Sequence, residues 1–299
     1  MTTPHHPFAE KTPHRRAYEG GGVRAVALVT GAARRIGRVI ALELAHAGLD
    51  IALHHRASDA ATLADVEATT RELQAAGARV LPFAADFGDP AATAALLPAV
   101  AQAFGRVDVV VNSASRFEYD SPADFDAALL ESLTRSNVAA PVALARALAA
   151  QVPAQARHAR TSPCVVNLLD QKLHNPNPDY FSYTLTKAAL AHATVLLAQA
   201  LAPAVRVCGV SPGITLVSGP MDEDEFAKAH KLTALGRSST PEDIARAVRF
   251  LVESPAITGI DLAVDGGQHL VGQARDVLFL ARNDAPSLLP SPPPEGQPG

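Results

Sequence analysis

Tyr183 and Lys187 are the two residues whose types and spacing point most directly to chemistry. They lie four positions apart in a segment predicted to be helical, and this spacing places both side chains on one face of the helix. A lysine ammonium beside a phenol favours the phenolate and lowers the tyrosine pKa from its usual value of about 10. The pair can therefore donate and accept a proton near neutral pH, whereas the alternative interpretation is an ordinary helix face.

Asp170 lies thirteen residues before Tyr183, directly after an apolar segment that is predicted to be a strand. A carboxyl group at that place can pass a proton to a group bound beside the tyrosine. The alternative is an aspartate whose hydrogen bonds are satisfied locally at the end of the strand. We therefore treat Asp170, Tyr183 and Lys187 as one candidate catalytic group.

A glycine-containing turn follows the first predicted strand and precedes a predicted helix. Gly31 and Gly37 border this turn, which reads Thr-Gly-Ala-Ala-Arg-Arg-Ile-Gly at 30–37. Such a turn lets backbone N–H groups approach a pyrophosphate, and the N-terminus of the helix adds a favourable dipole. The turn predicts a dinucleotide site, with a plain connection between strand and helix as the alternative.

The end of the second predicted strand indicates which dinucleotide would bind. Proteins that bind NAD usually carry an acid at this place, where it holds the ribose 2′-hydroxyl. Here the strand runs into His54, His55, Arg56 and Ser58, and the first acid is Asp59. Arg56 and Ser58 can bind a 2′-phosphate, so the sequence favours NADPH/NADP+ over NAD. The alternative is a solvated basic loop.

Asp86 follows the third predicted strand and is a candidate partner for the adenine amino group of a dinucleotide. Its alternative role is to cap the helix that begins at Pro90. Both roles suit an aspartate at the carboxyl end of a strand, because ligands of open α/β sheets bind at that edge.

The elements that must position these residues alternate along the chain. Short apolar segments alternate with long Ala- and Leu-rich segments, which is the pattern of βαβ units and a parallel sheet whose two faces are covered by helices. An acidic run at 222–225 marks the start of a further helix. The predicted strands lie at 26–29, 51–53, 80–81, 107–111, 165–169, 205–210 and 260–264, and the longer predicted helices at 35–47, 59–76, 90–104, 123–152, 180–202 and 241–253.

The composition of the 299 residues is that expected of a globular cytoplasmic protein. Hydrophobic residues make up 48% and charged residues 19%, which excludes a disordered chain, and the net charge of −4 gives no nucleic-acid footprint. No apolar run is long enough to span a membrane, and we expect no metal site. Cys164 and Cys208 lie in strand-like segments and are expected to be buried free thiols.

The two ends of the chain differ in composition from the middle. Residues 1–22 contain histidine and proline clusters followed by three glycines, and we expect a flexible leader there. Residues 23–272 contain the alternating pattern and suit one large α/β domain. Residues 273–299 become Pro-rich, and we expect a C-terminal tail that is partly disordered.

Five motifs in one order resemble those of the short-chain dehydrogenase/reductases. They are the turn at 30–37, Asn-Ser-Ala-Ser at 112–115, Asn137, Tyr-x-x-x-Lys at 183–187 and Ser-Pro-Gly at 211–213. The resemblance continues to the end motif Val-Asp-Gly-Gly at 264–267. It implies a single α/β domain, a doubly wound Rossmann fold with a seven-stranded parallel sheet of order 3-2-1-4-5-6-7.

The sequence is most similar to one branch of that family, the pteridine reductases and dihydromonapterin reductases. Arg35 stands where most relatives have the middle glycine of the phosphate loop, and Asp170 stands where most have serine. The second strand ends Leu-His-His-Arg-Ala-Ser, and Phe117 follows the fourth strand, as similar residues do in pteridine reductases. Ser113 departs from the pattern, because an asparagine is usual at that position.

The resemblance implies a role for each matching residue. Catalysis would fall to Asp170, Tyr183, Lys187 and Asn137, of which Asn137 would anchor a water that links Lys187 to solvent. The implied substrate ligands are Arg35, Ser115, Phe117, Asp170 and Tyr183. The implied cofactor ligands are Gly31, Arg34, Arg35, Ile36, Gly37, His54, His55, Arg56, Ser58, Asp86, Asn112, Ser113, Ala114, Ser115, Tyr183, Lys187, Pro212 and Gly213.

The activity that the resemblance implies is NADPH-dependent reduction of a C=N bond in a pterin, from a dihydropterin to a tetrahydropterin. A carboxyl at position 170 suits the amino and ring-nitrogen groups of such a heterocycle better than it suits a ketone. The first alternative is a reductase of a ketone or aldehyde, and the second is a non-catalytic NADPH-binding sensor. The family also implies a homotetramer that forms through the helices at 123–152 and 180–202.

Overall fold

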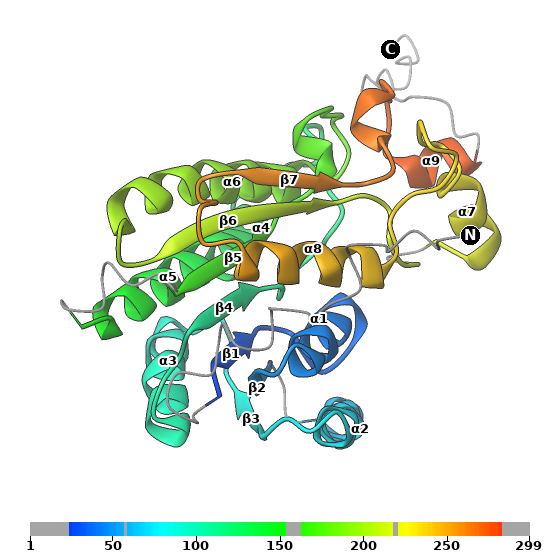
Figure 1. The fold of residues 1–299 in the computed structure, drawn as a ribbon. Coiled ribbons are helices and arrows are strands. Elements are labelled where there is room, and N and C mark those ends of the chain that lie inside the picture. Colours follow the sequence, from blue (N-terminus) through cyan, green and yellow to red (C-terminus); the bar gives the residue numbers. More distant parts are fainter. Residues whose placement is uncertain (1–23, 57–58, 154–162, 218–220, 283–299) are drawn as a thin grey trace, which may run out of the picture.

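Seven parallel strands form one sheet in the computed structural model, which describes residues 24–56, 59–153, 163–217 and 221–282. The strand order is β3-β2-β1-β4-β5-β6-β7, which confirms the predicted fold class and sheet order (Figure 1). The expected leader at 1–22 lies outside the described residues. The strands are β1 (Val26–Val29), β2 (Asp50–His55), β3 (Val80–Ala84), β4 (Val109–Asn112), β5 (Cys164–Leu168), β6 (Arg206–Pro212) and β7 (Asp261–Val264).

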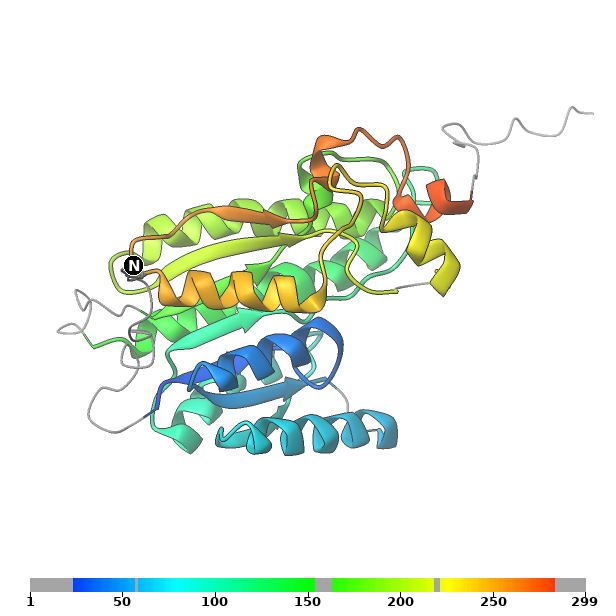
Figure 2. The ribbon, with the colours of Figure 1, turned by 45° about the vertical axis from the view of Figure 1, so that its right-hand side comes forward.

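Helices cover both faces of the sheet (Figures 1 and 2). Among the described helices, none is long and apolar enough to cross a lipid bilayer. The helices are α1 (Arg35–His46), α2 (Ala60–Ala75), α3 (Pro90–Phe104), α4 (Ala127–Thr134), α5 (Ala140–Gln151), α6 (Phe181–Leu201), α7 (Glu223–Ala229), α8 (Pro241–Glu253) and α9 (Val277–Arg282), with a π-helical turn η2 (Arg135–Ala139) and 3-10 turns η4 (Gln171–Leu173) and η5 (Gln268–Leu270).

The strands are apolar on both faces because each face packs against a separate layer of helices. Ala27 and Val29 of β1 pack with side chains of α1, α2 and α8, whereas Val26 and Leu28 pack with side chains of α3 and α5. Cys164 and Cys208 are buried in adjacent strands as free thiols, as predicted. The two cores hold the strand ends in register, so that the loops after β1 to β6 open at one edge of the sheet.

The segment predicted as one helix at 123–152 is divided in the structure. Asp126 caps α4 by accepting a hydrogen bond from the Ala128 N–H at 2.9 Å, which fixes the start of that helix at Ala127. The π-helical turn η2 then separates α4 from α5. Such turns often occur at functional sites, and this one contains Asn137.

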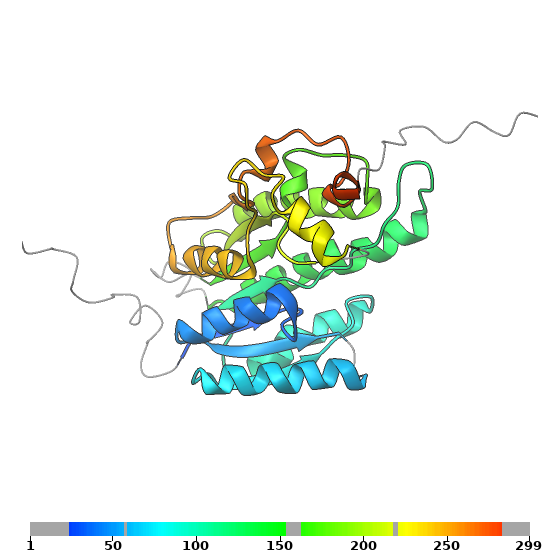
Figure 3. The same ribbon diagram turned by 90° about the vertical axis from the view of Figure 1, so that its right-hand side faces the viewer.

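The chain beyond Gly272, expected to be a tail, contains a helix that packs onto the domain. Helices α7 and α9 lie side by side (Figure 3). Ala229 of α7, Met221 before it, and Val277, Leu278 and Ala281 of α9 form a small apolar core. The run of acids at 222–225 opens α7 through a capping box, as the sequence suggested. The packed part of the chain therefore extends to Arg282, the last described residue.

Candidate active site

A cavity of about 720 Å³ lies along the carboxyl ends of the strands, where ligands of open α/β sheets bind. We call its wall from residues 31–115 the N-terminal half and its wall from residues 116–278 the C-terminal half. The N-terminal half contains Gly31, Arg34, Arg35, Ile36, Gly37, His55, Arg56, Asp59, Asp65, Asp86, Ser113, Ala114 and Ser115. The C-terminal half contains Phe117, Asp170, Lys172, Tyr180, Tyr183, Lys187, Pro212, Gly213, Met221, Gln273 and Asp276, among others.

The turn between β1 and α1 has the close backbone packing that a phosphate loop requires. Gly31 has a φ of +66°, and a Cβ on it would lie 3.2 Å from the Ala114 Cα. A Cβ on Gly37 would lie 2.3 Å from the Gly31 carbonyl oxygen, so only glycine allows the helix to start so near the strand. No side chain caps the N-terminus of α1 at Arg34, so the first N–H groups of the helix are not bonded to a capping side chain.

Arg35 adopts a φ of +55°, a left-handed conformation that glycine adopts more readily. The resemblance identified this position as one where most relatives carry glycine, so the backbone keeps the glycine-like conformation while a long cation replaces the hydrogen. The Arg35 guanidinium donates a hydrogen bond to the Val217 carbonyl oxygen at 2.9 Å. A strained residue that carries a charged group into a cavity is typical of a functional site.

His54 differs from its predicted role, because it lies behind the cavity wall rather than in it. It is 1% exposed, and its Nδ1 accepts a hydrogen bond from the Gly31 N–H at 3.1 Å. Its Nε2 lies 3.0 Å from the Ala85 carbonyl oxygen, and its ring stacks on Phe87. Burial lowers the pKa of His54 to about 4, so the ring is neutral and Nε2 carries the proton. His54 therefore holds the phosphate loop in place.

The carboxyl end of β2 places His55 and Arg56 in the cavity wall, and Ser58 lies outside the described residues. The nearest acid, Asp59, caps α2 and accepts hydrogen bonds from the Thr62 N–H at 2.9 Å and the Thr62 hydroxyl at 2.8 Å. These bonds hold the Asp59 carboxylate at the start of α2, and Arg56 supplies a positive charge beside it that suits a phosphate. Sequence reasoning missed Asp65 of α2, which also lines this end.

Asp86 also lies in the wall and makes a local turn. One of its carboxylate oxygens accepts a hydrogen bond from the Gly88 N–H at 2.8 Å. The cap of α3 is Asp89, which accepts from the Ala91 N–H at 2.8 Å, so the alternative role considered for Asp86 belongs to its neighbour. The second carboxylate oxygen of Asp86 keeps acceptor capacity toward the cavity.

The loop after β4 approaches the phosphate turn closely. The Thr30 hydroxyl accepts hydrogen bonds from the N–H groups of Ser113 and Ala114, both at 2.9 Å. Asn112, predicted as a cofactor ligand, lies beneath this loop at 3% exposure and outside the cavity wall. Its amide donates to the Asn167 side chain at 2.8 Å, a contact between β4 and β5 that fixes the two strand ends relative to each other.

Tyr183, Asp170 and Lys187 meet in the C-terminal half, as their spacing predicted. The Tyr183 hydroxyl donates a hydrogen bond to Asp170 Oδ2 at 2.9 Å. Asp170 Oδ1 accepts from the Lys172 N–H at 2.9 Å, which orients the carboxylate. The Lys187 ammonium donates to the Leu168 carbonyl oxygen at 2.7 Å and lies 5.6 Å from the centre of the Tyr183 ring. The group can hold and transfer a proton at the floor of the cavity.

The pKa of Tyr183 is raised well above its usual value, chiefly by burial and further by Asp170. The prediction that Lys187 lowers this pKa is wrong for this arrangement, because the carboxylate contacts the phenol directly while the ammonium is directed to a backbone carbonyl. Burial lowers the pKa of Lys187 to about 8. At neutral pH the phenol therefore keeps its proton, as a proton donor must.

Asn137 lies behind the wall and is 1% exposed. Its side chain accepts from the Arg116 N–H at 2.9 Å and donates to the Arg116 carbonyl oxygen at 3.0 Å. The same amide donates to the Thr186 hydroxyl at 3.1 Å, one residue before Lys187. Asn137 thus ties the β4 loop to α6, whereas the water contact implied by the family remains a prediction.

Phe117 lines the cavity beside the tyrosine and is 40% exposed. Its ring stacks on Tyr180 with centroids 4.1 Å apart and meets Tyr183 edge-on at 4.7 Å. Tyr180 has a φ of +52° at the N-cap of α6, and burial raises its pKa to about 12. The aromatic cluster gives the C-terminal half a flat apolar wall.

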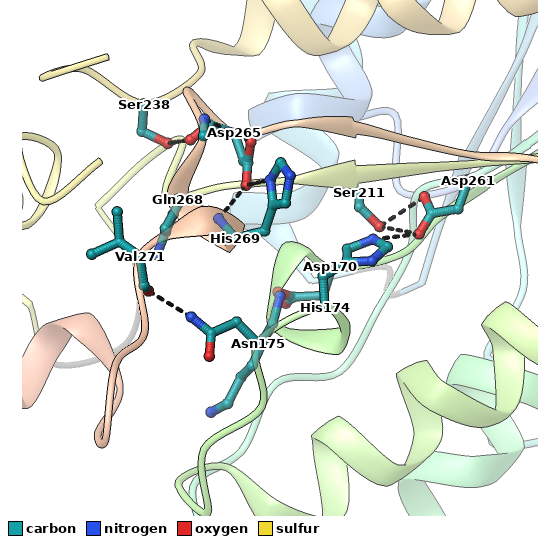
Figure 4. Close-up of polar contacts among 12 residues, drawn as sticks. Asp170, His174, Asn175, Ser211, Ser238, Asp261, Asp265, Gln268, His269 and Val271 are labelled. Atoms are coloured by element: carbon teal, nitrogen blue, oxygen red, sulfur yellow. Dashed lines mark hydrogen bonds and ion pairs between the residues drawn. The ribbon is translucent and has the colours of Figure 1, made fainter. Parts of the chain in front are cut away.

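Polar contacts fix η4, which follows Asp170, against β7 and η5 (Figure 4). The His174 ring lies 3.0 Å from a carboxylate oxygen of Asp261, which also accepts from the Ser211 hydroxyl at 2.8 Å. The Asn175 side chain donates to the Val271 carbonyl oxygen at 2.5 Å. These contacts join segments that are far apart in the sequence, and no sequence motif predicts them.

Comparisons with known proteins agree with this architecture. A family model described as "Enoyl-(Acyl carrier protein) reductase" matches residues 31–269. Pteridine reductase 1 of Leishmania tarentolae is 34% identical over 281 residues, covering 82% of this chain and 96% of that protein. L-rhamnose 1-dehydrogenase (NAD(P)(+)) of a Sphingomonas species is 29% identical over 252 residues, covering 81% of this chain and 95% of that protein.

A crystal structure of FolM alternative dihydrofolate reductase 1 from Brucella canis, complexed with NADP, has a TM-score of 0.78 to this chain. It is 33% identical and covers 88% of this chain and 98% of its own. The match of the family model begins at Gly31 in the turn after β1 and includes the candidate catalytic group and the end motif at 264–267. The chain therefore belongs to the short-chain dehydrogenase/reductase family, in a branch similar to the pteridine reductases.

Proposed function

We propose that this chain is an NADPH-dependent reductase that converts a dihydropterin to a tetrahydropterin. One observation carries the proposal: the Tyr183 hydroxyl donates to a carboxylate, Asp170, at 2.9 Å inside the cavity. A carboxylate in that position offers acceptor capacity and a proton path that suit a nitrogen heterocycle. The similarity to pteridine reductase 1 and to a FolM alternative dihydrofolate reductase supports the same substrate class.

The N-terminal half of the cavity, together with Lys187 and Gly213 of the C-terminal half, fits NADPH. The glycines at 31 and 37 and the start of α1 form a cradle for a pyrophosphate, and Gly213 lies where a Cβ would meet the Ser238 hydroxyl at 2.4 Å. Arg56 would hold the 2′-phosphate, and Lys187 would bind the nicotinamide ribose. The FolM structure named above is complexed with NADP, which supports this cofactor. When bound, the nicotinamide supplies a hydride.

The catalytic group would supply the proton that accompanies the hydride. Reduction of C=N places the hydride on carbon, and the π electrons move to nitrogen, which takes a proton. Tyr183 and Asp170 hold a dissociable proton between oxygens 2.9 Å apart, and the raised pKa of Tyr183 keeps it in place at neutral pH. The pair would release that proton to the ring nitrogen and regain one from solvent.

The second candidate is reduction of a ketone or aldehyde. L-rhamnose 1-dehydrogenase is among the similar proteins, so membership of the family does not define the substrate class by itself. The third interpretation, a non-catalytic NADPH sensor, finds less support, because Asp170, Tyr183 and Lys187 are all in the cavity wall with the contacts that proton transfer needs.

The deciding experiment is an NADPH-oxidation assay with dihydropterins, dihydrofolate and simple ketones. We expect turnover with a dihydropterin, and Asp170→Asn should lower that activity by roughly 10- to 100-fold because an amide cannot pass a proton as a carboxyl group can. Asp170→Ser should lower pterin reduction while sparing or raising ketone reduction. Reduction of ketones but of no dihydropterin by the unmodified protein would support the second candidate instead.

We also propose a homotetramer formed through α4, α5 and α6. Leu185, Val195 and Leu196 of α6 and Phe125 before α4 are between 41% and 61% exposed. Apolar side chains of that size on long neighbouring helices suit an interface between copies. Size-exclusion chromatography with light scattering would test this assembly, with about four times the chain mass expected.

A further inference from the structure

The segment that begins α9 is fixed to the loop before α6 by a buried ion pair. The Arg275 guanidinium donates to both carboxylate oxygens of Asp179, at 2.8 and 2.9 Å. The Asp276 N–H donates to the same carboxylate at 2.7 Å. The side chains of Arg275 and Asp179 are 10% and 4% exposed. Two parallel charge-assisted bonds in a buried place hold this segment in one position.

This attachment places the Asp276 side chain in the cavity wall, close to the catalytic group. Asp276 lines the same cavity as Asp170 and Tyr183. Lys172 links it to the catalytic group, because the Lys172 N–H donates to Asp170 Oδ1 at 2.9 Å. Oδ2 of Asp276 lies 3.6 Å from the Lys172 ammonium, which also donates to the Asp179 carbonyl oxygen.

The Asp276 carboxylate keeps acceptor capacity that the protein itself does not use. One oxygen accepts from the Leu278 N–H at 3.1 Å, the first bond of α9. An ionised carboxylate has about four acceptor sites, so acceptor capacity remains for a ligand beside the Leu278 N–H and the Lys172 ammonium. Lys172 is 4% exposed and offsets the charge of the carboxylate, and burial still raises the pKa of Asp276. A carboxylate in such a place is stabilised when it gains N–H donors.

We propose that Asp276 is a recognition subsite for the N–H donors of the substrate, namely the amino group and adjacent ring nitrogen of an aminopyrimidine ring. The inference rests on the proposed reduction of a pterin and names the residue that selects it. Two N–H donors side by side match the two oxygens of one carboxylate, and each bond is charge-assisted. A simple ketone offers no such donor, so Asp276 would distinguish the heterocycle from it. Lys172 is a positioning residue that holds the carboxylate.

The test compares three variants of the full chain: Asp276→Asn, Lys172→Met and the control Glu242→Gln, which removes one exposed charge of α8 outside the cavity wall. We measure kcat and KM for 7,8-dihydrobiopterin, KM for its 2-dimethylamino analogue, and the Kd of NADPH. Asp276→Asn should raise KM for the dihydropterin roughly 10- to 100-fold, since bonds to a charged group are lost. The Kd of NADPH should stay within about twofold, which also reports that the variant is folded.

The analogue separates recognition from structure. The analogue lacks the exocyclic N–H donors, so its KM with the unmodified protein should be higher than that of the dihydropterin. Asp276→Asn should raise the KM of the analogue little further. Lys172→Met leaves the α9 cap intact and should also raise KM for the dihydropterin. Equal KM values for the protein and Asp276→Asn, or equal losses with both substrates, would overturn the inference while the proposed function stands. If the unmodified protein reduces no dihydropterin, the proposed function itself fails.

Discussion

The two halves of the cavity are assembled in different ways. The N-terminal half comes from consecutive strand–loop–helix units, and its main contacts are made by backbone groups and by glycines whose Cβ would collide with neighbouring atoms. The C-terminal half is held in place by contacts between distant segments, such as the ion pair of Asp179 and Arg275, which are 96 positions apart. The comparison teaches that close backbone packing can form one wall of a cavity, whereas the other wall depends on buried side chains, several of them charged.

The largest effect that would sharpen this comparison is expected from Tyr183→Phe. The change removes the phenol proton donor of the C-terminal half and touches no residue of the N-terminal half. General acids contribute roughly 10²–10⁴-fold, so kcat should fall by that factor. Stopped-flow binding of NADPH should be nearly unchanged.

Near-normal turnover by Tyr183→Phe would mean that Asp170 or water supplies the proton without the tyrosine. Asp170→Asn in the same background would then show whether the carboxyl alone is responsible. The outcome matters because the two oxygens lie 2.9 Å apart and share one hydrogen bond.

Most of the residues that the sequence assigned to the N-terminal half do line the cavity, for a physical reason. The turn at 30–37 and the segment at the end of β2 are each only a few residues long, so the residue types and spacing within each segment carry the information. His54 was assigned to the cofactor, yet it supports the Gly31 N–H from behind, because a side chain at the end of a strand can point into the core instead.

The C-terminal half was predicted only where neighbouring elements carry the pattern. The spacing of Asp170, Tyr183 and Lys187 identified the candidate catalytic group, since α6 follows β5 directly along the chain and Asp170 lies between them. Lys172 and Asp276 were missed, because their meeting depends on how the chain beyond Gly272 returns to the domain. The Pro-rich composition of that region predicted no helix there. The six residues of α9 are also too few for their apolar pattern to predict one.

Arg275→Met should give the second-largest effect. It removes the ion pair with Asp179, which supports only the C-terminal half of the cavity. It leaves the Asp179 carboxylate buried without its guanidinium partner, and removing one member of a buried pair costs about 3–5 kcal/mol. We expect a lower Tm in thermal unfolding and a raised KM for the dihydropterin, with the Kd of NADPH changed much less.

Arg282→Met is the matched control for that variant. Arg282 pairs with Glu225 on the surface of the same segment, where ion pairs contribute about 0–1 kcal/mol. An equal fall in Tm and an equal rise in KM for the two variants would show that the attachment of α9 does not depend on the buried pair. The contrast between the two halves of the cavity would then be weaker.

Arg56→Asp is expected to give a moderate effect, confined to the N-terminal half. The proposed 2′-phosphate contact is charge-assisted, and we expect about 2 kcal/mol, or roughly 30-fold, of preference for NADPH over NADH. The variant should erode that preference in kcat/KM measured with both cofactors. Arg71→Asp, an exposed change on α2 outside the cavity wall, should leave the preference intact. Equal kcat/KM for NADPH and NADH in the unmodified protein would contradict the assignment.

The smallest effect concerns the support of the phosphate loop by His54, and it appears as a dependence of stability on pH. The pKa of His54 is about 4 in the folded protein, whereas the free side chain has a pKa of 6.5. The unfolded chain therefore binds more protons between these values, so stability is lost as the pH falls below 6.5. Between about pH 7 and about pH 5.5 the loss should be about 1 kcal/mol, measured by urea unfolding.

His54→Asn should remove this part of the pH dependence, because an amide keeps an acceptor for the Gly31 N–H and does not titrate. His192→Asn, an exposed change on α6, serves as the control and should leave the slope unchanged. A slope that is the same in all three proteins would show that the ring is not buried as a neutral group. The N-terminal half would then owe its geometry to the glycines alone, and its contrast with the C-terminal half, which depends on buried side-chain charges, would become sharper.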